Sequence, residues 1–511
     1  MRHVGPMLVL AIATIALTWP LAAHLADAYP GYTRIADDDL LVNVWSLWWT
    51  RASLLEGRGG FFFTRYLFYP DGVTLTLTAI CPVASLAVLP VLKLLPGLAG
   101  VELAWNLNVL ATFWLSGVGA YLLAERVTGE RWAALVGGLV FAFSPYRYEH
   151  LRHVNLSCTQ WLPFVFLGLE AGGWRLEAAA LALVIASSTT YTAQLPLFLA
   201  VYGVFWVIAQ EDRRAAARRF VGALPVPVAL GVLLAAPALL PALADLATTA
   251  FEAPVWDDPM NFSFPIESFF TPNLTPYVGV IALALAVRAV VRVKGSGPWA
   301  AVAFLGLALA PGPWLKTSAG VTSIPLPYAF VRYFPGLGQN RFTERFLVFW
   351  WLGAAVLAAQ AIASWRPYTR SPRTWALVIG ALAMLDVRQA PIALERPEVP
   401  AIYAELARAP ADWPVYEWPA DYLTNRRFMY YQMVHQRPIC QGVLSRRPLA
   451  SYQAEEVDAL SQLPNMILVL HHDVTAQPHI QHKLEVLRRR YDVKPFAKDG
   501  PIEALLLTLK R

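Results

Sequence analysis

Charged residues are scarce in this sequence. Asp, Glu, Lys and Arg make up 15% of the 511 residues, whereas soluble globular proteins carry roughly 25%. Together with the 57% of hydrophobic residues, this scarcity excludes an ordinary soluble enzyme. Cysteine is rare as well: Cys81, Cys158 and Cys440 are too few for a disulfide framework and lack the paired spacing of a zinc site.

Several sequence signatures of soluble chemistry are also missing. The chain has no glycine-rich phosphate loop, no His-Glu-x-x-His motif and no Gly-x-Ser-x-Gly motif. ATP-driven transport and soluble-type hydrolysis are therefore unsupported. The sequence is instead rich in aromatic side chains, with 19 Trp, 20 Tyr and 25 Phe, and this composition excludes a disordered chain.

Long uncharged runs predict membrane-spanning helices, because about 20 apolar residues are needed to cross a hydrocarbon core of roughly 30 Å. These runs lie at 4–25, 103–124, 132–146, 154–169, 220–244, 272–287, 298–315, 346–364 and 374–385. The uncharged stretch between Glu177 and Glu211 is too long for one span, and its polar patch at 187–192 predicts two short spans joined by a tight turn. In total we expect about 11 spans, some of them tilted or broken.

The placement of the charges tests this count. If the N-terminus lies inside, basic residues collect in every second loop, as the positive-inside rule requires. The inside residues are then Arg126, Arg131, Arg175, Arg213, Arg214, Arg218, Arg219, Arg288, Arg292, Lys294, Arg366, Arg370 and Arg373. The net charge of +6 reflects this topology and gives no reason to expect nucleic acid.

One apolar segment, at 79–95, has to stay outside if the basic residues of the later loops are to lie inside. It carries Pro82, Pro90 and Lys93, so we interpret it as an interfacial or re-entrant helix. If the segment spans the membrane instead, every later loop changes side. With the first interpretation, the long loops at 26–100, 245–271 and 316–343 lie outside.

After about residue 390 the composition changes, and charges of both signs become frequent. Strand-like runs at 414–418, 466–470 and 502–509 and an amphipathic helix at 480–491 predict a soluble α/β domain. The fold class is thus a polytopic α-helical membrane protein, with a transmembrane domain at 1–390 and an extracytoplasmic α/β domain at 391–511. His471, His472 and Asp473, with the later His479 and His482, could suggest a metal, but their loose spacing favours a loop.

The first outside loop contains three adjacent carboxylates, Asp37, Asp38 and Asp39, followed by apolar residues on helical spacing. Trp45, Trp48 and Trp49 favour the membrane–water interface, so we expect this helix to lie flat on the bilayer. The aspartates would then stand at its N-terminus, where they either cap the helix or act as a general base or metal ligands. One carboxylate can cap while a neighbour does chemistry. The nearby 68–72 stretch, Phe-Tyr-Pro-Asp-Gly, predicts a turn.

A second group of ionisable residues stands at the outside end of a predicted span. Arg147, His150, Arg152 and His153 lie close together there, and such groups at membrane level usually face a cavity or each other. Arginine suits a lipid phosphate, which it can bind through two parallel hydrogen bonds. The alternative is that both arginines extend to ordinary lipid headgroups. Gln160 follows in the next span and would line the same cavity.

A third group precedes the span at 346–364. Arg341 and Arg345 are four residues apart, which predicts that they share one face of a starting helix and offer an anion site. The alternative is that these arginines and Glu344 are solvated or paired charges at a helix end.

These segments, taken in order, resemble the GT-C-type integral membrane glycosyltransferases, and in particular a bacterial branch of multi-span proteins. The matching parts are the acidic first loop with its tryptophans, FYPDG at 68–72, FAFSPYRYEHLRHVNL at 141–156, TQWLP at 159–163, RFTERF at 341–346 and MYYQMVHQRPICQGVLSRRP at 429–448. The similarity runs along most of the chain, and each motif is specific only in combination with the others.

The resemblance implies transfer of a sugar from a polyprenyl-phosphate donor to a glycan, lipid or protein acceptor of the cell envelope, outside the cytoplasmic membrane of a bacterium. In this family an Asp of the first outside loop acts as, or orients, the catalytic base. Among Asp37, Asp38 and Asp39 we expect Asp38 or Asp37 to do so here, and the spacing does not choose between them. His150 or His153 would replace the second acidic group that some members carry. That replacement is a departure from the better-known members.

The same resemblance implies the binding residues. Arg147, Arg152, Arg341 and Arg345 would hold the donor phosphate, and a divalent cation, Mn²⁺ or Mg²⁺, could join Asp37–Asp39. We expect Trp45, Tyr69 and Gln160 to line the substrate cavity. Two alternatives stay open: a non-catalytic scaffold that keeps the fold, and a transporter of lipid-linked sugars.

Overall fold

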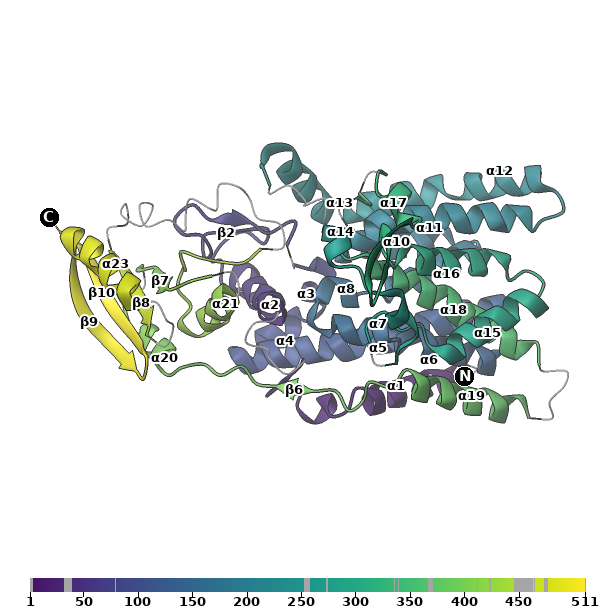
Figure 1. The fold of residues 1–511 in the computed structure, drawn as a ribbon, viewed down its shortest axis with the longest axis horizontal. Helices are drawn as coiled ribbons and strands as arrows, with labels where there is room; N and C mark the ends of the chain where they lie inside the picture. Colours follow the sequence, from purple (N-terminus) through teal and green to yellow (C-terminus); the bar gives the residue numbers. More distant parts are fainter. Residues whose placement is uncertain are drawn as a thin grey trace.

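A computed structural model describes residues 3–31, 39–78, 80–251, 258–272, 274–334, 336–338, 340–365, 371–410, 412–421, 424–444, 463, 465–472 and 477–510. The molecule is elongated, with a helical body at one end and a small β-sheet domain at the other (Figure 1). The N-terminus lies in the helical body, and the C-terminus lies at the far tip of the sheet domain.

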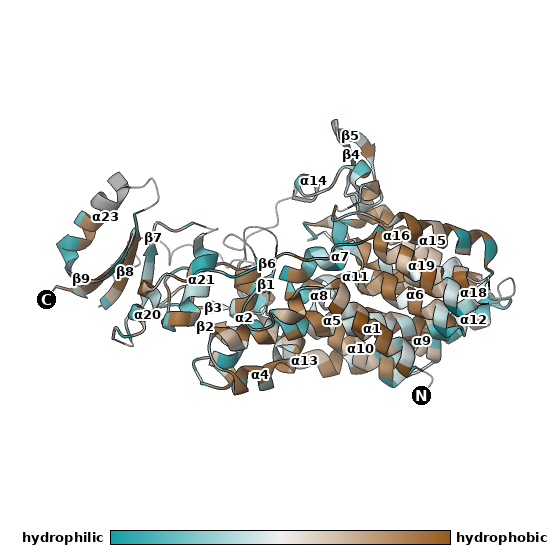
Figure 2. Ribbon diagram, turned by 90° about the horizontal axis from the view of Figure 1, so that it is seen from below, coloured by the Kyte–Doolittle hydropathy of each residue, from teal (hydrophilic) through white to brown (hydrophobic). Residues whose placement is uncertain are grey.

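Helices occupy each of the predicted apolar runs. They are α1 (Val4–Leu17), α5 (Leu98–Thr128), α6 (Arg131–Ala142), α9 (Trp161–Ala171), α10 (Trp174–Ser187), α11 (Thr189–Ile208), α12 (Arg213–Ala223), α13 (Pro225–Thr248), α15 (Val280–Arg292), α16 (Gly297–Leu309), α18 (Leu347–Ala363) and α19 (Pro372–Asp386). Figure 2 shows that hydrophobic residues dominate these helices, except for the arginine-rich α12.

Four helical stretches of the described chain are long and apolar enough to cross a membrane: Leu98–Thr128, Thr189–Ile208, Arg213–Thr248 and Thr343–Ala363. Val4–Leu17 and Gly297–Leu309 are shorter apolar helices. The structure therefore supports a helical membrane fold, and the count of about 11 spans stays a prediction.

The predicted break in the uncharged stretch before Glu211 is confirmed. Helix α10 ends at Ser187 and α11 begins at Thr189, with Ser188 between them in an extended conformation. The Ser188 hydroxyl accepts a hydrogen bond from the backbone N–H of Tyr191, as a helix N-cap does.

Helix α18 is the centre of the helical body. Of the 18-residue apolar stretch that contains most of α18, 94% is buried. The helix packs on α5, α6, α15 and α16. Small residues permit this close packing: a Cβ on Gly353 would come within 2.8 Å of backbone atoms of α16, and one on Gly306 within 2.7 Å of the backbone N of Trp350. Helix α13 is the opposite case, because its apolar surface is largely exposed, as expected for contact with lipid.

The segment at 79–95 forms two short helices, α3 (Pro82–Ala87) and α4 (Leu89–Leu94). Each has six residues and is therefore about 9 Å long at about 1.5 Å per residue, too short to cross the hydrocarbon core. This geometry agrees with the interfacial or re-entrant interpretation.

The Phe-Tyr-Pro-Asp-Gly stretch forms the predicted turn. It joins β2 (Phe63–Thr64) to β3 (Val73–Thr74), and the Gly72 N–H donates to the Phe68 carbonyl at 3.0 Å. Gly72 has φ +80°, and a Cβ there would lie 2.5 Å from the Thr64 carbonyl oxygen, so only glycine fits.

The expectation that the tryptophan helix lies flat on the bilayer is wrong. Helix α2 (Leu40–Leu54) is buried on nearly every side, including Trp45, Trp48 and Trp49. It packs between α5 of the helical body and α21 of the tail domain. The tail domain covers the face that the sequence pattern assigns to lipid.

The tail domain contains a four-stranded sheet in the order β7-β8-β10-β9. Strands β7 (Val415–Trp418) and β8 (Asn465–His471) are parallel, and β10 (Ile502–Leu509) is antiparallel to β8 and to β9 (Tyr491–Asp499). Its helices are α20 (Ile402–Leu406), α21 (Thr424–His435) and α23 (Gln477–Arg490). The strands and the late helix lie where the sequence predicts them, except that β9 was not expected.

One continuous apolar core joins the tail domain to the helical body. Strand β1 (Tyr29–Pro30) pairs with β6 (Leu394–Glu395), and the backbone N–H of Ile439 donates to the Tyr66 carbonyl.

The remaining elements are α7 (Pro145–Glu149), α8 (Val154–Ser157), α14 (Asp258–Asn261), α17 (Tyr328–Val331), η1 (Leu21–Ala23), η3 (His150–Arg152), η4 (Ile266–Phe270), η5 (Thr343–Phe346), β4 (Trp314–Thr317) and β5 (Gly320–Pro325).

Candidate functional site

Three ionic side chains from distant parts of the sequence meet at the start of α2. One carboxylate oxygen of Asp39 lies 2.8 Å from a guanidinium nitrogen of Arg426 on α21. The other carboxylate oxygen lies 3.3 Å from Nε2 of His153, just before α8. We call Asp39, His153 and Arg426 the Asp39 cluster. The Asp39 side chain is 45% exposed, so the cluster opens to its surroundings.

The carboxylate of Asp39 does not cap α2. Asp39 occupies the N-cap position, but its side chain makes no capping hydrogen bond. The carbonyl oxygen of Asp39 accepts from the backbone and side-chain nitrogens of Asn43, and the Asn43 side-chain oxygen accepts from the N–H of Val154. Asn43 thus links the start of α2 to residues 150–153, which we call the histidine-bearing loop, while the Asp39 carboxylate faces His153 and Arg426.

Electrostatics keep Asp39 ionised. Burial raises the pKa of this carboxyl group, but the hydrogen bond with His153 and the positive charges of Arg426, His153 and Arg152 outweigh it and lower the pKa to about 2. A group with such a low pKa is a weak base at neutral pH. Asp37 and Asp38 lie outside the described residues, so the structure does not place them.

His150 and His153 are neighbours, with Nδ1 atoms 3.4 Å apart. Burial lowers the pKa of His150 well below its usual value, and the positive charges of His153, Arg345 and Arg152 lower it further. His150 is therefore a neutral imidazole at pH 7. This histidine is buried beside Tyr146, whereas His153 is the one that reaches the carboxylate.

The four predicted phosphate-binding arginines have different surroundings. Arg147 is buried: its guanidinium donates to the Ser157 carbonyl at 3.0 Å, to the Thr159 hydroxyl and to the Thr112 hydroxyl at 3.2 Å. It also lies over the Phe113 ring. These contacts hold the loop after α7 in place, which is a structural role.

Arg152 lies at the edge of the Asp39 cluster, where its charge acts on Asp39. Its guanidinium is 2.7 Å from a carboxylate oxygen of Glu149, and the second oxygen of Glu149 accepts from the Thr275 hydroxyl.

The prediction that Arg341 and Arg345 share one helix face is wrong, because helical structure begins only at Thr343. Arg341 is exposed beside the ring of Phe262, and Arg345 lies over the ring of Phe342. Of the two, Arg345 is the one whose charge reaches His150 and Tyr146. Arg345, in the short helix η5 directly before α18, therefore lies near the histidine-bearing loop.

The three residues expected to line a substrate cavity do not meet in one described cavity. Trp45 is buried and donates from Nε1 to the Gln432 side-chain oxygen at 2.7 Å. Tyr69 packs on the core of the tail domain, and its N–H donates to the Ile439 carbonyl. Gln160 is buried just before α9, beside Cys158.

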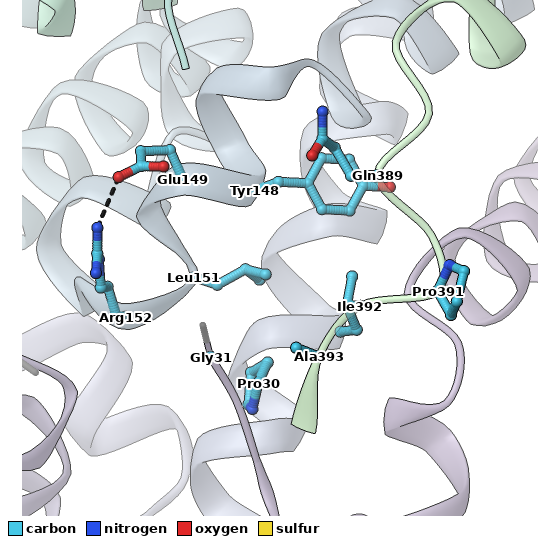
Figure 3. Close-up of a pocket in the computed structure, with 10 residues that line it drawn as sticks. All are labelled: Pro30, Gly31, Tyr148, Glu149, Leu151, Arg152, Gln389, Pro391, Ile392 and Ala393. Carbon is cyan, nitrogen blue, oxygen red and sulfur yellow. Dashed lines mark hydrogen bonds and ion pairs between the residues drawn. The ribbon is translucent and has the colours of Figure 1, made fainter. Parts of the chain in front are cut away.

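A cavity of about 190 Å³ lies next to the histidine-bearing loop (Figure 3). It is lined by Pro30, Gly31, Tyr148, Glu149, Leu151, Arg152, Gln389, Pro391, Ile392 and Ala393. The Glu149–Arg152 ion pair lies on one side and the linker after α19 on the other (Figure 3). Pro30 and Gly31, at the end of the described part of the first loop, line one wall of this cavity.

Arg426 and Gln389 do not stand out in the sequence as site residues. Arg426 precedes the 429–448 motif and lies in a region where charges are frequent, so nothing distinguishes it from a solvated residue. Gln389 belongs to a linker without a motif. Neither residue could be identified without the contact between the tail domain and the first loop.

No group of three His, Cys, Asp or Glu side chains within the described ranges is arranged to hold a metal ion. His471, the last residue of β8, pairs with Glu417, and His472, in the turn that follows, pairs with Glu503. The loop interpretation is therefore wrong for His471 and correct for His472. Asp39 does not fit a cation site, because Arg426 and His153 already face its two oxygens.

Solved structures show the same fold at low sequence identity. The Archaeoglobus fulgidus oligosaccharyltransferase tethered to an acceptor peptide matches with a TM-score of 0.58 and 10% identity, over 100% of this chain and 74% of that one. The same enzyme in complex with an inhibitory peptide and a dolichol-phosphate matches with a TM-score of 0.50, 11% identity and the same coverage.

A third match is the mycobacterial arabinofuranosyltransferase AftD, with a TM-score of 0.55 and 16% identity, over 99% of this chain and 41% of that one. No protein-family model and no curated protein sequence matches the chain. The structural matches cover nearly the whole chain, helical body and tail domain together. The chain therefore has the fold of the GT-C-type membrane glycosyltransferases.

Proposed function

We propose that this chain is a membrane glycosyltransferase that transfers a sugar from a polyprenyl-phosphate donor to a cell-envelope acceptor on the outer face of the membrane. The fold supports the reaction class, and one of the similar enzymes was solved with a dolichol-phosphate. The observation that carries the proposal is the Asp39 cluster, in which an acidic segment, a histidine-bearing loop and the tail domain converge.

Glycosyl transfer needs a base near the acceptor hydroxyl and positive charge near the departing phosphate. A base works best when its pKa is near the working pH, and the pKa of Asp39 is about 2. We therefore assign Asp39 to positioning His153 and Arg426, and we assign proton removal to Asp37 or Asp38. If Mn²⁺ or Mg²⁺ takes part, these two residues are its proposed ligands.

We assign the donor phosphate to Arg152 and Arg345. The charge of Arg152 acts on Asp39, and that of Arg345 acts on His150, the neighbour of His153. Arg147 supports the loop from behind through its contacts to Ser157 and Thr159. The cavity beside Glu149 and Arg152 adjoins this site and offers space for part of a substrate.

The test uses the full chain in lipid vesicles with polyprenyl-phosphate-linked sugars and measures release of the polyprenyl phosphate. Asp37→Asn or Asp38→Asn is expected to lower the rate about 100-fold or more, because a positioned base contributes about 100- to 10,000-fold. Asp71→Asn, in the exposed turn of the same loop, is the matched control and should keep the rate.

Undiminished transfer by Asp37→Asn, Asp38→Asn and Asp39→Asn would reject the enzyme proposal. Movement of the lipid-linked sugar across the vesicle without transfer would indicate a transporter. Copurification with an active transferase that supplies all of the activity would indicate a scaffold.

A further inference from the structure

Two of the three cysteines meet in the interior of the molecule. Cys81 directly precedes α3 and Cys158 directly follows α8, 77 residues later, and their sulfur atoms are 3.8 Å apart. Both side chains are fully buried. Cys440 is in a different place, in the apolar core of the tail domain. The sequence spacing gives no sign of the pairing.

The two thiols are in direct contact. At 3.8 Å their sulfur atoms are within hydrogen-bond distance, and either thiol can be the donor. The folded chain therefore holds the two sulfurs side by side, as thiol–disulfide exchange between them requires.

We propose that Cys81 and Cys158 form a redox site that closes to a disulfide bond. A disulfide has an S–S length of about 2.05 Å, so the two sulfurs need to approach by less than about 2 Å from their present separation. The proposal is independent of the proposed glycosyl transfer.

The chemistry is exchange with an external disulfide, either a small molecule or a protein. The Cys81 thiolate attacks one sulfur of the oxidant, which releases a thiolate and leaves a mixed disulfide on Cys81. The Cys158 thiol then gives up its proton, and its sulfur attacks Cys81 and displaces the second thiolate. Two protein thiols become one disulfide, and two electrons and two protons leave with the reduced oxidant. Because both sulfurs are buried, the reaction takes place before the two segments have packed completely.

A disulfide bond between Cys81 and Cys158 would restrict the movement of the histidine-bearing loop. Cys158 stands between Ser157 and Thr159, the two residues held by the Arg147 guanidinium. Helix α8 begins at Val154, immediately after the His153 side chain that faces Asp39. A Cys81–Cys158 bond therefore fixes α8 against α3 and limits the movement of His153.

The experiment examines the full chain in bacterial cells with an oxidising envelope. Cells are quenched with acid, free thiols are blocked with N-ethylmaleimide in denaturant, and the protein is digested with trypsin without reductant and analysed by mass spectrometry. Cleavage after Arg65, Lys93, Arg152 and Arg175 places Cys81 and Cys158 in separate peptides, 66–93 and 153–175. We expect these two peptides to be joined, with Cys440 carrying the maleimide. Maleimide on both Cys81 and Cys158, or a bridge from either one to Cys440, would overturn the proposal.

A second measurement needs no digestion. Reductant is expected to lower the melting temperature of the wild-type chain and of the matched control Cys440→Ser by several degrees, because it reopens a long loop. Reductant should leave Cys81→Ser and Cys158→Ser unchanged. If the single variants do not fold, the peptide map of the wild type and of Cys440→Ser decides alone.

Discussion

Asp39 shows how the tail domain enters the chemistry of the first loop. Its two carboxylate oxygens face His153 of the histidine-bearing loop and Arg426 of α21, more than 100 and nearly 400 residues away respectively. Arg426 is almost buried in this arrangement, with its side chain only 11% exposed. Removing either partner leaves a partly desolvated charge, which is costlier than losing an exposed ion pair.

Replacing Arg426 by Ala is therefore expected to weaken the proposed reaction. Without that guanidinium the pKa of Asp39 rises from about 2, and the carboxylate that faces His153 loses one of the two contacts that hold it in place. We expect a loss in kcat/KM of roughly 10- to 100-fold, measured as polyprenyl-phosphate release. Arg408→Ala, an exposed arginine after α20, is the matched control and should act as wild type. An unchanged rate in Arg426→Ala would remove Arg426 from the site.

The pH dependence of stability gives a second test of the same cluster. The folded-state pKa of Asp39 is about 2, below its ordinary value of 3.8, so the ionised carboxylate stabilises the fold above pH about 4 and this contribution is lost as the pH falls toward 2. The melting temperature of the wild type should exceed that of Asp39→Asn above pH 4 and converge with it at lower pH. The effect is modest, on the order of 1 kcal/mol, because Asp39 is half exposed and screened by water.

The control for this titration is the same comparison in the Arg426→Ala background, where the difference between the two melting curves should shrink. A difference that persists unchanged to pH 2, or one that grows on acidification, contradicts an ionised and paired Asp39.

The histidines and arginines near residue 150 could be identified from sequence because ionisable groups at the end of an apolar run are rare. Their individual roles could not. Arg147 and Arg152 look equivalent in the sequence, yet one is buried against Ser157 and Thr159 while the other borders the cluster. The directions of the Arg147 and Arg152 side chains depend on where the chain breaks between α7 and α8. Sequence patterns for helix ends do not predict that break.

At the scale of elements, α2 is the clearest departure from expectation. Its tryptophans do stack, with the rings of Trp45 and Trp49 parallel and 5.8 Å apart, but they do so inside the protein. An interfacial helix and a helix buried between two domains have the same composition, since both combine apolar and amphipathic side chains. Only the long-range contact with α21 separates the two cases.

Trp45→Phe tests this docking. The change removes the hydrogen bond from Trp45 Nε1 and leaves the Gln432 side-chain oxygen unpaired in the interior, which costs about 1–3 kcal/mol. Trp49→Phe removes a similar ring, and Nε1 of Trp49 has no hydrogen-bond partner in the described part of the chain, so it is the matched control. Denaturant unfolding should show a larger loss of stability for Trp45→Phe. Equal losses would mean that the hydrogen bond contributes nothing beyond packing.

Helices were the most predictable elements. Uncharged runs placed the helices of the body, and the polar patch at 187–192 located the turn at Ser188. Strand β9 was missed because its sequence, YDVKPFAKD, contains a proline and four charges and has little β-type alternation. It is an edge strand paired only with β10, where such residues are tolerated.

At the scale of the molecule, the positive-inside rule predicts which end of the fold lies outside the cytoplasm. The tail domain and the start of α2 lie at one end of the helical body, and α12 lies toward the opposite end (Figure 1). The arginine-rich α12 includes four of the residues that the positive-inside rule assigns to the cytoplasm. The Asp39 cluster would then be outside, on the side where a polyprenyl-phosphate donor is used in the proposed reaction.

Reporter fusions test this orientation directly. Alkaline phosphatase, which is active only outside the cytoplasm, is fused after Arg511 in one chain and inserted in the exposed turn at 210–212, before α12, in another. We expect activity from the first fusion and none from the second, because the arginines of α12 hold that loop inside. Green fluorescent protein at the same two positions is the control and should give the opposite pattern. Phosphatase activity at 210–212 with none after Arg511 would invert the map, and the Asp39 cluster would then face the cytoplasm, where a donor presented on the outer face could not reach it.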